Sequence, residues 1–288
     1  MTEVNYLESL NPLQYESVCS TEGPNLIIAG AGTGKTKVLT TRVAHIIDNN
    51  LAFPSQILCV TFTNKAAREM SERVQKLVSQ NMEKMPWMGT FHSIGAKIIR
   101  NHAEVIGLKQ SFTILDKDDQ LSLIKQIIKA ENLDQSQFSP KLIQSKIDHW
   151  KNKALNPNDI KSESLDNLVD EKSLSIYKIY QARLFEINCL DFGDLLLQCI
   201  NLFKVTDIHK RYSNNFKYIH VDEYQDTNAA QYKWLKLLGS HHQNVCCVGD
   251  DDQSIYSWRG AEVDNMLRFE KEFENAKVIR LKQNYRST

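Results

Sequence analysis

Six short apolar runs along the chain predict buried strands. They cover residues 25–29, 57–62, 87–91, 216–221, 244–248 and 277–281. Runs without a regular polar position are typical of parallel strands covered on both faces. Amphipathic helical patterns over residues 35–48, 64–79, 228–239 and 262–273 lie between most of them. This alternation predicts an α/β fold built on one parallel, doubly wound sheet.

The third and fourth apolar runs are separated by about 125 residues, whereas a crossover between parallel strands needs only about a dozen or more. Helical periodicity over residues 116–131, 140–152 and 165–187, with few strand formers, fills this interval. We therefore predict a first part of the sheet domain in residues 1–110, an inserted all-helical subdomain in 111–188, and the second part in 189–288.

Composition narrows the protein class without naming a partner. The 288 residues include 35 Lys+Arg and 35 Asp+Glu, a formal net charge of +0, so nucleic-acid binding would require a local basic face. The six cysteines form no CxxC pair, and no apolar run approaches the ~18 residues of a membrane span. These features predict a soluble, cytoplasmic protein with no membrane partner.

The stretch AGAGTGKT follows the first predicted strand and precedes a predicted helix. This order is what a phosphate-binding P-loop requires, with Lys35 reaching the outer phosphates and the Thr36 hydroxyl binding Mg²⁺. The strict motif has glycine where this chain has Ala29, and the alternative is a purely structural turn. The candidate nucleotide-binding residues here are Ala29, Gly30, Ala31, Gly32, Thr33, Gly34, Lys35, Thr36 and Lys37.

Two adjacent carboxylates follow the fourth predicted strand in the stretch VDEYQDT. A P-loop enzyme needs a carboxylate beside its metal, and we predict that Asp222 binds Mg²⁺ through water. Glu223 is the predicted catalytic base for the attacking water. The alternative is an acidic loop that is simply solvated.

The fifth predicted strand ends in VGDDDQSIYSWRGA. Ligands of open α/β sheets bind at the carboxyl ends of the strands, so Gln253 is predicted to sense a γ-phosphate. Tyr256 and Trp258 have two interpretations on spacing alone: core anchors, or exposed platforms for stacking bases.

Two further segments carry candidate nucleotide contacts. Past the sixth predicted strand, Arg286 is placed to reach a γ-phosphate and Tyr285 to cover a base. Near the start, the Gln14 amide matches the hydrogen-bonding edge of adenine, although most such glutamines are surface residues.

Candidate DNA contacts follow the second and third predicted strands, in TFTNKAAREM and GTFHSIG. Hydroxyl, amide and basic groups at a helix N-terminus suit a nucleic-acid phosphate, and an aromatic ring there can stack on a base. The alternative is an amphipathic helix with a solvated polar face. The candidates are Phe62, Thr63, Asn64, Lys65, Thr90 and His92.

Together with LNPLQ, DFGDLL and QNYRST, these motifs in this order resemble superfamily 1 DNA helicases of the UvrD/PcrA/Rep type. The resemblance runs from about residue 7 to the last residue. It implies a RecA-like motor domain interrupted by a helical accessory domain. It also implies ATP and Mg²⁺ as cofactors, and 3′ to 5′ movement on single-stranded DNA towards duplex junctions. In that family alanine is usual at the position of Ala29.

The resemblance also implies roles for single residues. Gln14 and Tyr285 would contact adenine, whereas Lys35, Thr36, Asp222, Glu223, Gln253 and Arg286 would handle phosphates, metal and water. Phe62, His92, Phe192, Tyr256 and Trp258 would line the single-strand path, which favours stacking over core anchoring for the last two.

The family's motor pairs two RecA-like domains, and the resemblance predicts that the second is missing from these 288 residues. We therefore expect the chain alone to hydrolyse ATP very slowly and not to unwind DNA. The alternatives are the motor part of a helicase-nuclease subunit and a non-unwinding translocase. Other classes are a P-loop GTPase, disfavoured because Asn64-Lys65 is not followed by x-Asp, and a non-catalytic nucleic-acid-binding module, disfavoured by Lys35 together with Glu223.

Overall fold

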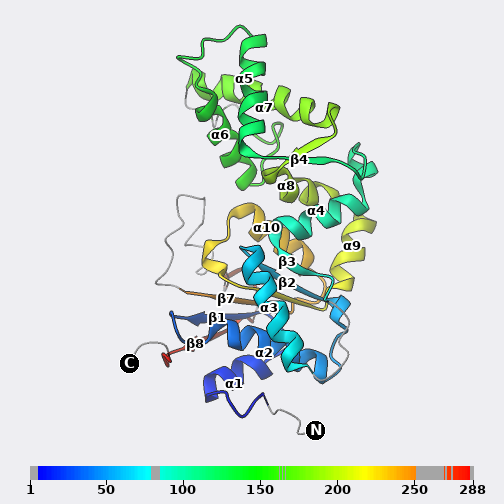
Figure 1. The fold of residues 1–288 in the computed structure, drawn as a ribbon, viewed down its shortest axis with the longest axis vertical. Helices are drawn as coiled ribbons and strands as arrows, with labels where there is room; N and C mark the ends of the chain where they lie inside the picture. The colour runs from blue at the N-terminus through cyan, green and yellow to red at the C-terminus, as the bar shows by residue number, and fades with distance from the viewer. Residues whose placement is uncertain are drawn as a thin grey trace. The chain divides into compact units, whose positions relative to one another are not determined.

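The computed structural model describes residues 6–78, 85–161, 163, 165, 167–250, 269, 271–273 and 275–285. The chain divides into two compact units. Unit 1 comprises Met1–Ile94, Thr206–Asn228 and Leu235–Thr288, and unit 2 comprises Gly95–Val205 and Ala229–Trp234. Figure 1 labels most of the helices and strands of both units.

Unit 1 is built on a parallel sheet with the strand order β3-β2-β6-β7-β1-β8 among the described residues. Every position of the four inner strands is buried, as a sheet covered on both faces requires, whereas the two edge strands β3 and β8 are only partly buried. The mixed α/β class with a parallel sheet is confirmed. The strands are β1 (Asn25–Ala29), β2 (Ile57–Thr61), β3 (Met88–Thr90), β6 (Tyr218–Val221), β7 (Val245–Gly249) and β8 (Lys277–Leu281).

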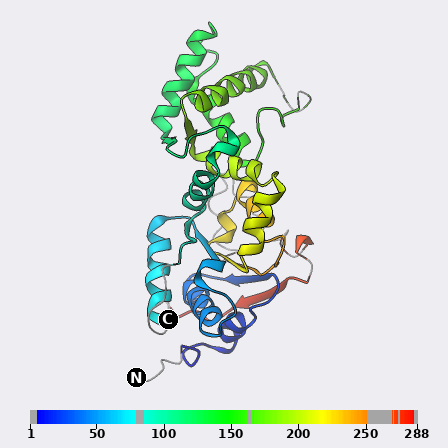
Figure 2. The ribbon, with the colours of Figure 1, turned by 90° about the vertical axis from the view of Figure 1, so that its right-hand side faces the viewer.

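Two helices of unit 1 begin at side-chain caps. A capping box of Asn11 and Gln14 starts α1 (Pro12–Cys19), and the Thr63 hydroxyl caps α3 (Asn64–Leu77). Apolar residues of α1 and α2 (Lys35–Asp48) join those of the sheet in one core, and Figure 2 shows β1 and β8 side by side with these helices on one face. Also present are η1 (Pro54–Gln56), α9 (Thr206–Asn215) and η4 (Tyr224–Asp226).

Two helices cross the boundary between the units, namely α4 (Phe91–Asn101) and α10 (Ala229–Leu238). The predicted helix over 262–273 lies mostly outside the described residues. Among the described helices, none combines the length and the apolar character needed to cross a membrane.

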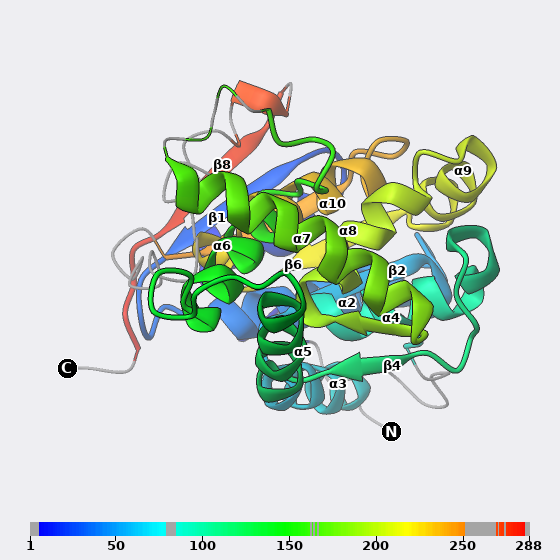
Figure 3. The same ribbon diagram turned by 90° about the horizontal axis from the view of Figure 1, so that it is seen from above.

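Unit 2 is mainly helical, with a core of its own that includes Ile128, Ile143, Tyr177 and Leu184. Figure 3 looks onto its helices, which are η2 (Ala103–Ile106), α5 (Lys117–Ala130), α6 (Pro140–Asn152), α7 (Leu168–Glu186) and α8 (Phe192–Leu202). The predicted insertion of residues 111–188 lies in this unit, and its boundaries as a domain stay a prediction.

The predicted all-helical insertion at 111–188 contains a short strand, β4 (Thr113–Leu115). This strand pairs in parallel with β5 (Cys189–Asp191), which lies just past the predicted end of the insertion. Each has three residues, which is too few to display a strand periodicity in the sequence. Because β5 is followed directly by α8, the pairing holds the backbone immediately before Phe192.

Candidate nucleotide and DNA site

The glycine-rich turn connects β1 to α2 in unit 1, as predicted. Gly32 and Gly34 have φ of +80° and +91°, a conformation that glycine adopts without steric cost. A Cβ on Gly34 would also lie 2.8 Å from Gln14 Nε2. Within the described residues, no side chain caps α2 and its first turn contains no acidic residue. The backbone N–H groups of this turn therefore suit a phosphate, because an anion would satisfy them.

Gln14 and Tyr285, the two predicted adenine contacts, both lie against this loop. Gln14 is only 2% exposed, and its Nε2 donates to the Thr33 carbonyl at 2.9 Å. The Tyr285 backbone N–H donates to the Gly32 carbonyl at 2.9 Å, and the Tyr285 hydroxyl accepts from Asn11 Nδ2 at 2.7 Å. The Gln14 side chain and the Tyr285 backbone thus contact the glycine-rich loop, and the contact of either residue with adenine stays a prediction.

A chain of polar contacts links the loop to the carboxylates after β6. Lys35 Nζ lies 3.0 Å from Asp250 Oδ2 at the end of β7, the strand between β1 and β6. The Asp250 backbone N–H donates to Gln225 Oε1 at 3.0 Å, and Gln225 Nε2 donates to Glu223 Oε2 at 2.8 Å. The predicted phosphate-binding lysine and the predicted catalytic base therefore belong to one network.

The two carboxylates at the end of β6 differ in their surroundings. Burial raises the pKa of Asp222 to about 6, with a further contribution from the neighbouring Glu223 carboxylate. Glu223 has φ +50° and ψ 46°, an uncommon left-handed conformation for a residue with a side chain. A divalent cation beside these groups would favour their ionised forms, and carboxylate and hydroxyl oxygens are the ligands that Mg²⁺ takes. Asp222 and the Thr36 hydroxyl fit such an ion.

The predicted DNA contacts of unit 1 gather at the ends of β2 and β3, where Thr61 and Thr90 are in register. Phe62 follows β2, is half-buried and packs edge-on against Phe91, with ring centroids 5.6 Å apart. Thr63, Asn64 and Lys65 are exposed at the start of α3.

The remaining contacts near these strand ends are Thr90 and His92. Thr90 Oγ1 accepts from the Ser93 backbone N–H at 3.1 Å, so this hydroxyl caps the start of α4. Burial lowers the pKa of His92, and at neutral pH this ring brings no positive charge to a phosphate. Six of the predicted DNA-binding residues therefore lie at or just after the ends of β2 and β3. Their contact with DNA stays a prediction.

Phe192 belongs to unit 2, where it opens α8 and is 51% exposed. An exposed phenyl ring at a helix start suits base stacking. The predicted residues Gln253, Tyr256, Trp258 and Arg286 lie outside the described residues.

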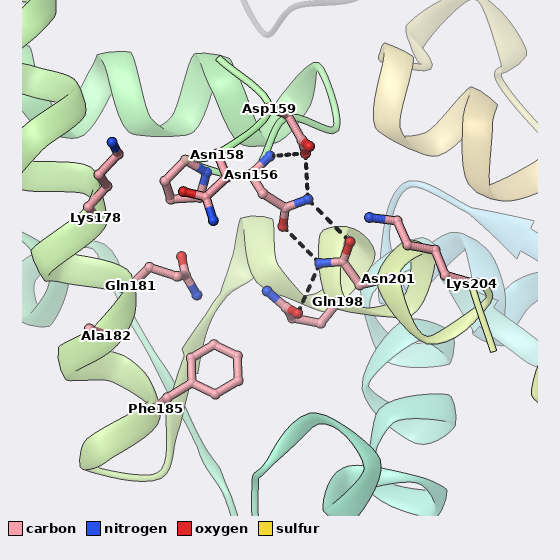
Figure 4. Close-up of a pocket in the computed structure, with 11 residues that line it drawn as sticks. Asn156, Asn158, Asp159, Lys178, Gln181, Ala182, Phe185, Gln198, Asn201 and Lys204 are labelled. Carbon is pink, nitrogen blue, oxygen red and sulfur yellow. Dashed lines mark hydrogen bonds between the residues drawn. The ribbon is translucent and has the colours of Figure 1, made fainter. Parts of the chain in front are cut away.

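A hollow of about 510 Å³ in unit 2 is lined in part by amide side chains, among them Asn156, Gln198 and Asn201 (Figure 4). None of the predicted nucleotide or DNA residues lines it. No group of three or more potential metal-ligating side chains occurs in the part of the chain that the structure describes.

Three residues that contact the predicted nucleotide-site residues were not assigned from the sequence, namely Asp250, Gln225 and Asn11. Asp250 lies in a run of three aspartates, and no feature of that run indicates which one faces Lys35. Gln225 and Asn11 have local signals only: Gln225 stands two residues after Glu223, and Asn11 begins a capping box three residues before Gln14. Such signals predict turns and caps rather than contacts with a distant loop.

Comparison with known proteins bears on the same motifs. The family model described as the UvrD/REP helicase N-terminal domain matches residues 10–274. The DNA helicase II of Rickettsia typhi is 51% identical over 292 residues, covering 100% of this chain and 44% of that protein. The ATP-dependent DNA helicase PcrA of Staphylococcus aureus is 50% identical over 283 residues, covering 98% of this chain and 38% of that protein.

A probable DNA helicase II homolog of Rickettsia conorii is 50% identical over 291 residues, again covering 100% of this chain and 44% of the relative. The chain thus spans less than half the length of each of these relatives, and the match covers nearly all of this chain. It belongs to the UvrD/REP helicase family and represents the N-terminal region of such a helicase.

Proposed function

We propose that this chain is the nucleotide-binding motor half of an ATP-dependent DNA helicase that moves 3′ to 5′ on single-stranded DNA. The observation that carries the proposal is the connection of Lys35 through Asp250 and Gln225 to Glu223. It supports a site in which the occupant of the phosphate loop affects the residue that activates water. The polarity is inferred from the family resemblance.

Each residue of the network has a proposed role. Lys35 leaves Asp250 and pairs with the outer phosphates of ATP, while the N–H groups at the start of α2 bind phosphate oxygens. Thr36 and Asp222 hold Mg²⁺, which neutralises phosphate charge when it is bound. Glu223 accepts the proton of the attacking water. Gln253 and Arg286 are proposed to contact the γ-phosphate.

The proposed DNA path uses the strand ends of β2 and β3. The N-terminus of α3, with the Thr63, Asn64 and Lys65 side chains exposed, suits a backbone phosphate. Phe62 and Phe192 are proposed to stack on bases, as are Tyr256 and Trp258. Thr90 and His92 complete the set. Stacking is tolerant of sequence, as a translocating enzyme requires.

The proposal includes a second RecA-like domain as the partner that completes the ATP site. The chain covers 38% to 44% of the relatives described above, which supports a larger whole protein. We propose that residues 1–110 and 189–288 form the first motor domain around an insertion at 111–188. Alone, this chain would turn over ATP very slowly and would not unwind duplex DNA. The cytoplasm is the proposed location.

The substitution Glu223→Gln in the full-length protein tests the role of the base. The amide is isosteric but accepts no proton, so we expect ATP affinity to be retained while kcat for hydrolysis falls by about 10²- to 10⁴-fold. Equilibrium nucleotide binding and steady-state hydrolysis measure the two quantities. Glu272→Gln, which changes an exposed glutamate paired with Lys236, is the matched control. A fully active Glu223→Gln enzyme would remove the assignment.

A further inference from the structure

A buried charge cluster lies in unit 2, away from the nucleotide loop in the sequence. Lys151 Nζ on α6 contacts Asp191 Oδ2 at 2.6 Å and Asp194 Oδ1 at 2.9 Å, and all three side chains are at most 1% exposed. The Tyr180 hydroxyl donates to the same Asp191 oxygen at 3.0 Å. Neither the family match nor the proposed ATP site gives these residues a role.

The two aspartates flank Phe192 in the sequence Asp-Phe-Gly-Asp. They form a capping box, in which Asp191 Oδ1 accepts from the Asp194 N–H at 2.9 Å and Asp194 Oδ2 accepts from the Asp191 N–H at 3.3 Å. Each carboxylate thus holds the turn with one oxygen and Lys151 with the other. Phe192, between them, stays half exposed.

Gly193 allows the lysine to reach this turn. A Cβ on Gly193 would lie 2.8 Å from Lys151 Cδ and 2.9 Å from Lys151 Cβ. The aliphatic stem of the lysine therefore passes against the backbone of the residue that follows Phe192. The Lys151 side chain therefore holds the turn in two ways: its stem packs against the Gly193 backbone, and its ammonium group pairs with both carboxylates.

A second layer of side chains holds Asp194. Gln181 Nε2 on α7 donates to Asp194 Oδ1 at 3.0 Å, and Gln198 on α8 lies at 3.5 Å from the same oxygen. Figure 4 shows both amides beside the polar hollow. Residues from α6, α7 and α8 thus converge on one short turn.

The cluster holds one ammonium group for two carboxyl groups. Burial by itself would lower the pKa of Lys151, but the carboxylates of Asp191 and Asp194 outweigh it and the net shift is upward. Burial raises the pKa of Asp194, and the Asp191 charge adds to this shift. Lys151 is therefore the charge that allows both carboxyl groups to occupy this interior.

We propose that Lys151 is a positioning residue for DNA: by tying Asp191 and Asp194 together in the turn that carries Phe192, it holds that ring in the orientation that stacks on a nucleobase. The proposal rests on the proposed function, because it takes single-stranded DNA as the ligand of Phe192. A ring with half of its surface in solvent loses orientational freedom only if its backbone is fixed, and a ring already oriented binds at a lower entropic cost.

The main test removes the charges without removing the caps. The triple substitution Lys151→Met, Asp191→Asn and Asp194→Asn in the full-length protein removes the three charges of this cluster, and asparagine still accepts the cap hydrogen bonds. Affinity for a fluorescent oligothymidylate is measured by anisotropy at fixed salt, alongside ATP affinity and thermal unfolding. We expect the DNA affinity to fall roughly 5- to 100-fold, as for the loss of one stacked base, with ATP affinity unchanged.

A double-mutant cycle separates positioning from general damage. Phe192→Ala alone should weaken DNA binding to the same extent, and adding the triple substitution to it should weaken binding no further. The matched control is Lys146→Met with Asp170→Asn, which removes another lysine–aspartate pair between α6 and α7 and should leave DNA affinity unchanged.

If the triple variant does not fold, Gly193→Ala provides a second test. Its methyl group displaces the lysine stem or the turn and removes no charge, so DNA affinity should fall while ATP affinity is retained. A folded triple variant or Gly193→Ala variant with wild-type DNA affinity would overturn the proposal, as would additivity with Phe192→Ala. If the wild-type full-length protein neither binds single-stranded DNA nor hydrolyses ATP faster in its presence, the proposed function itself is refuted.

Discussion

Lys35 and Lys151, one in each unit, pair with buried aspartates, and their surroundings differ. Among the described residues, Lys35 pairs with the Asp250 carboxylate, and its side chain is 12% exposed beside an uncapped helix start. Lys151 meets two carboxylates, has no exposed surface, and lies against the rings of Tyr177 and Tyr180 with its Nζ 5.6 and 5.2 Å from their centroids.

These surroundings distinguish an ion pair whose lysine can exchange its aspartate for a ligand from an ion pair that stays intact in the folded protein. In the proposed site, Lys35 turns to a phosphate of the neighbouring glycine-rich loop, and the lost Asp250 contact is replaced by another of the same sign. Lys151 holds two buried carboxylates, and breaking its contacts would leave both of them in the interior. One lysine therefore suits ligand binding, and the other suits structural positioning.

The largest expected effect is on stability, from Lys151→Met. Removing one partner of a buried ion pair costs about 3–5 kcal/mol, because the remaining charges are left without compensation. We expect the free energy of unfolding of the full-length protein to fall by this amount, measured by urea unfolding with circular dichroism. The triple charge-free variant should recover most of the loss. An unchanged urea midpoint for Lys151→Met would show that the ion pairs of Lys151 do not stabilise the folded protein.

The opposite signature is expected for Lys35→Ala. Hydrogen bonds to charged groups contribute about 1.5–3 kcal/mol, so nucleotide affinity should fall by about 10- to 150-fold, measured by titration with a fluorescent ATP analogue. The stability loss should be smaller than that of Lys151→Met, because Lys35 is partly exposed and removing its side chain would open the buried Asp250 carboxylate to water. Retained nucleotide affinity would contradict the assignment of Lys35 to phosphate.

The smallest effect is expected for Asp250→Asn. If Lys35 must leave Asp250 to bind phosphate, removing the carboxylate charge lowers the competition, and nucleotide affinity should rise by a few-fold. The asparagine preserves the size of the side chain, and the Gln225 contact, which uses the backbone of residue 250, is unaffected. A large loss of nucleotide affinity in the same titration would instead make Asp250 part of the binding site.

The sequence predicted the sheet well for a physical reason. Strands covered on both faces contain continuous apolar runs, and the described strand bounds lie within two residues of those runs. The glycine turn was equally predictable, since Gly34 needs a positive φ and precedes Lys35 in a known pattern. The short strands β4 and β5 were not, because three residues carry no period.

The ion pairs of Lys35 and Lys151 could not be predicted from the sequence. Lys151 and Asp191 are 40 residues apart in the chain, and a lysine in an amphipathic helix is usually solvated. The same applies to Lys35 and Asp250, which are 215 residues apart. Local patterns predict caps and strands, whereas pairing across such separations depends on how the elements pack.

Steady-state ATP hydrolysis by the full-length protein, with and without single-stranded DNA, is the most direct test of the central claim that nucleotide and DNA sites form one motor. Lys35→Ala serves as the blank. The account predicts strong stimulation of hydrolysis by DNA, and loss of that activity in the blank. Equal rates with and without DNA would contradict it and leave an ATPase whose partner is something else.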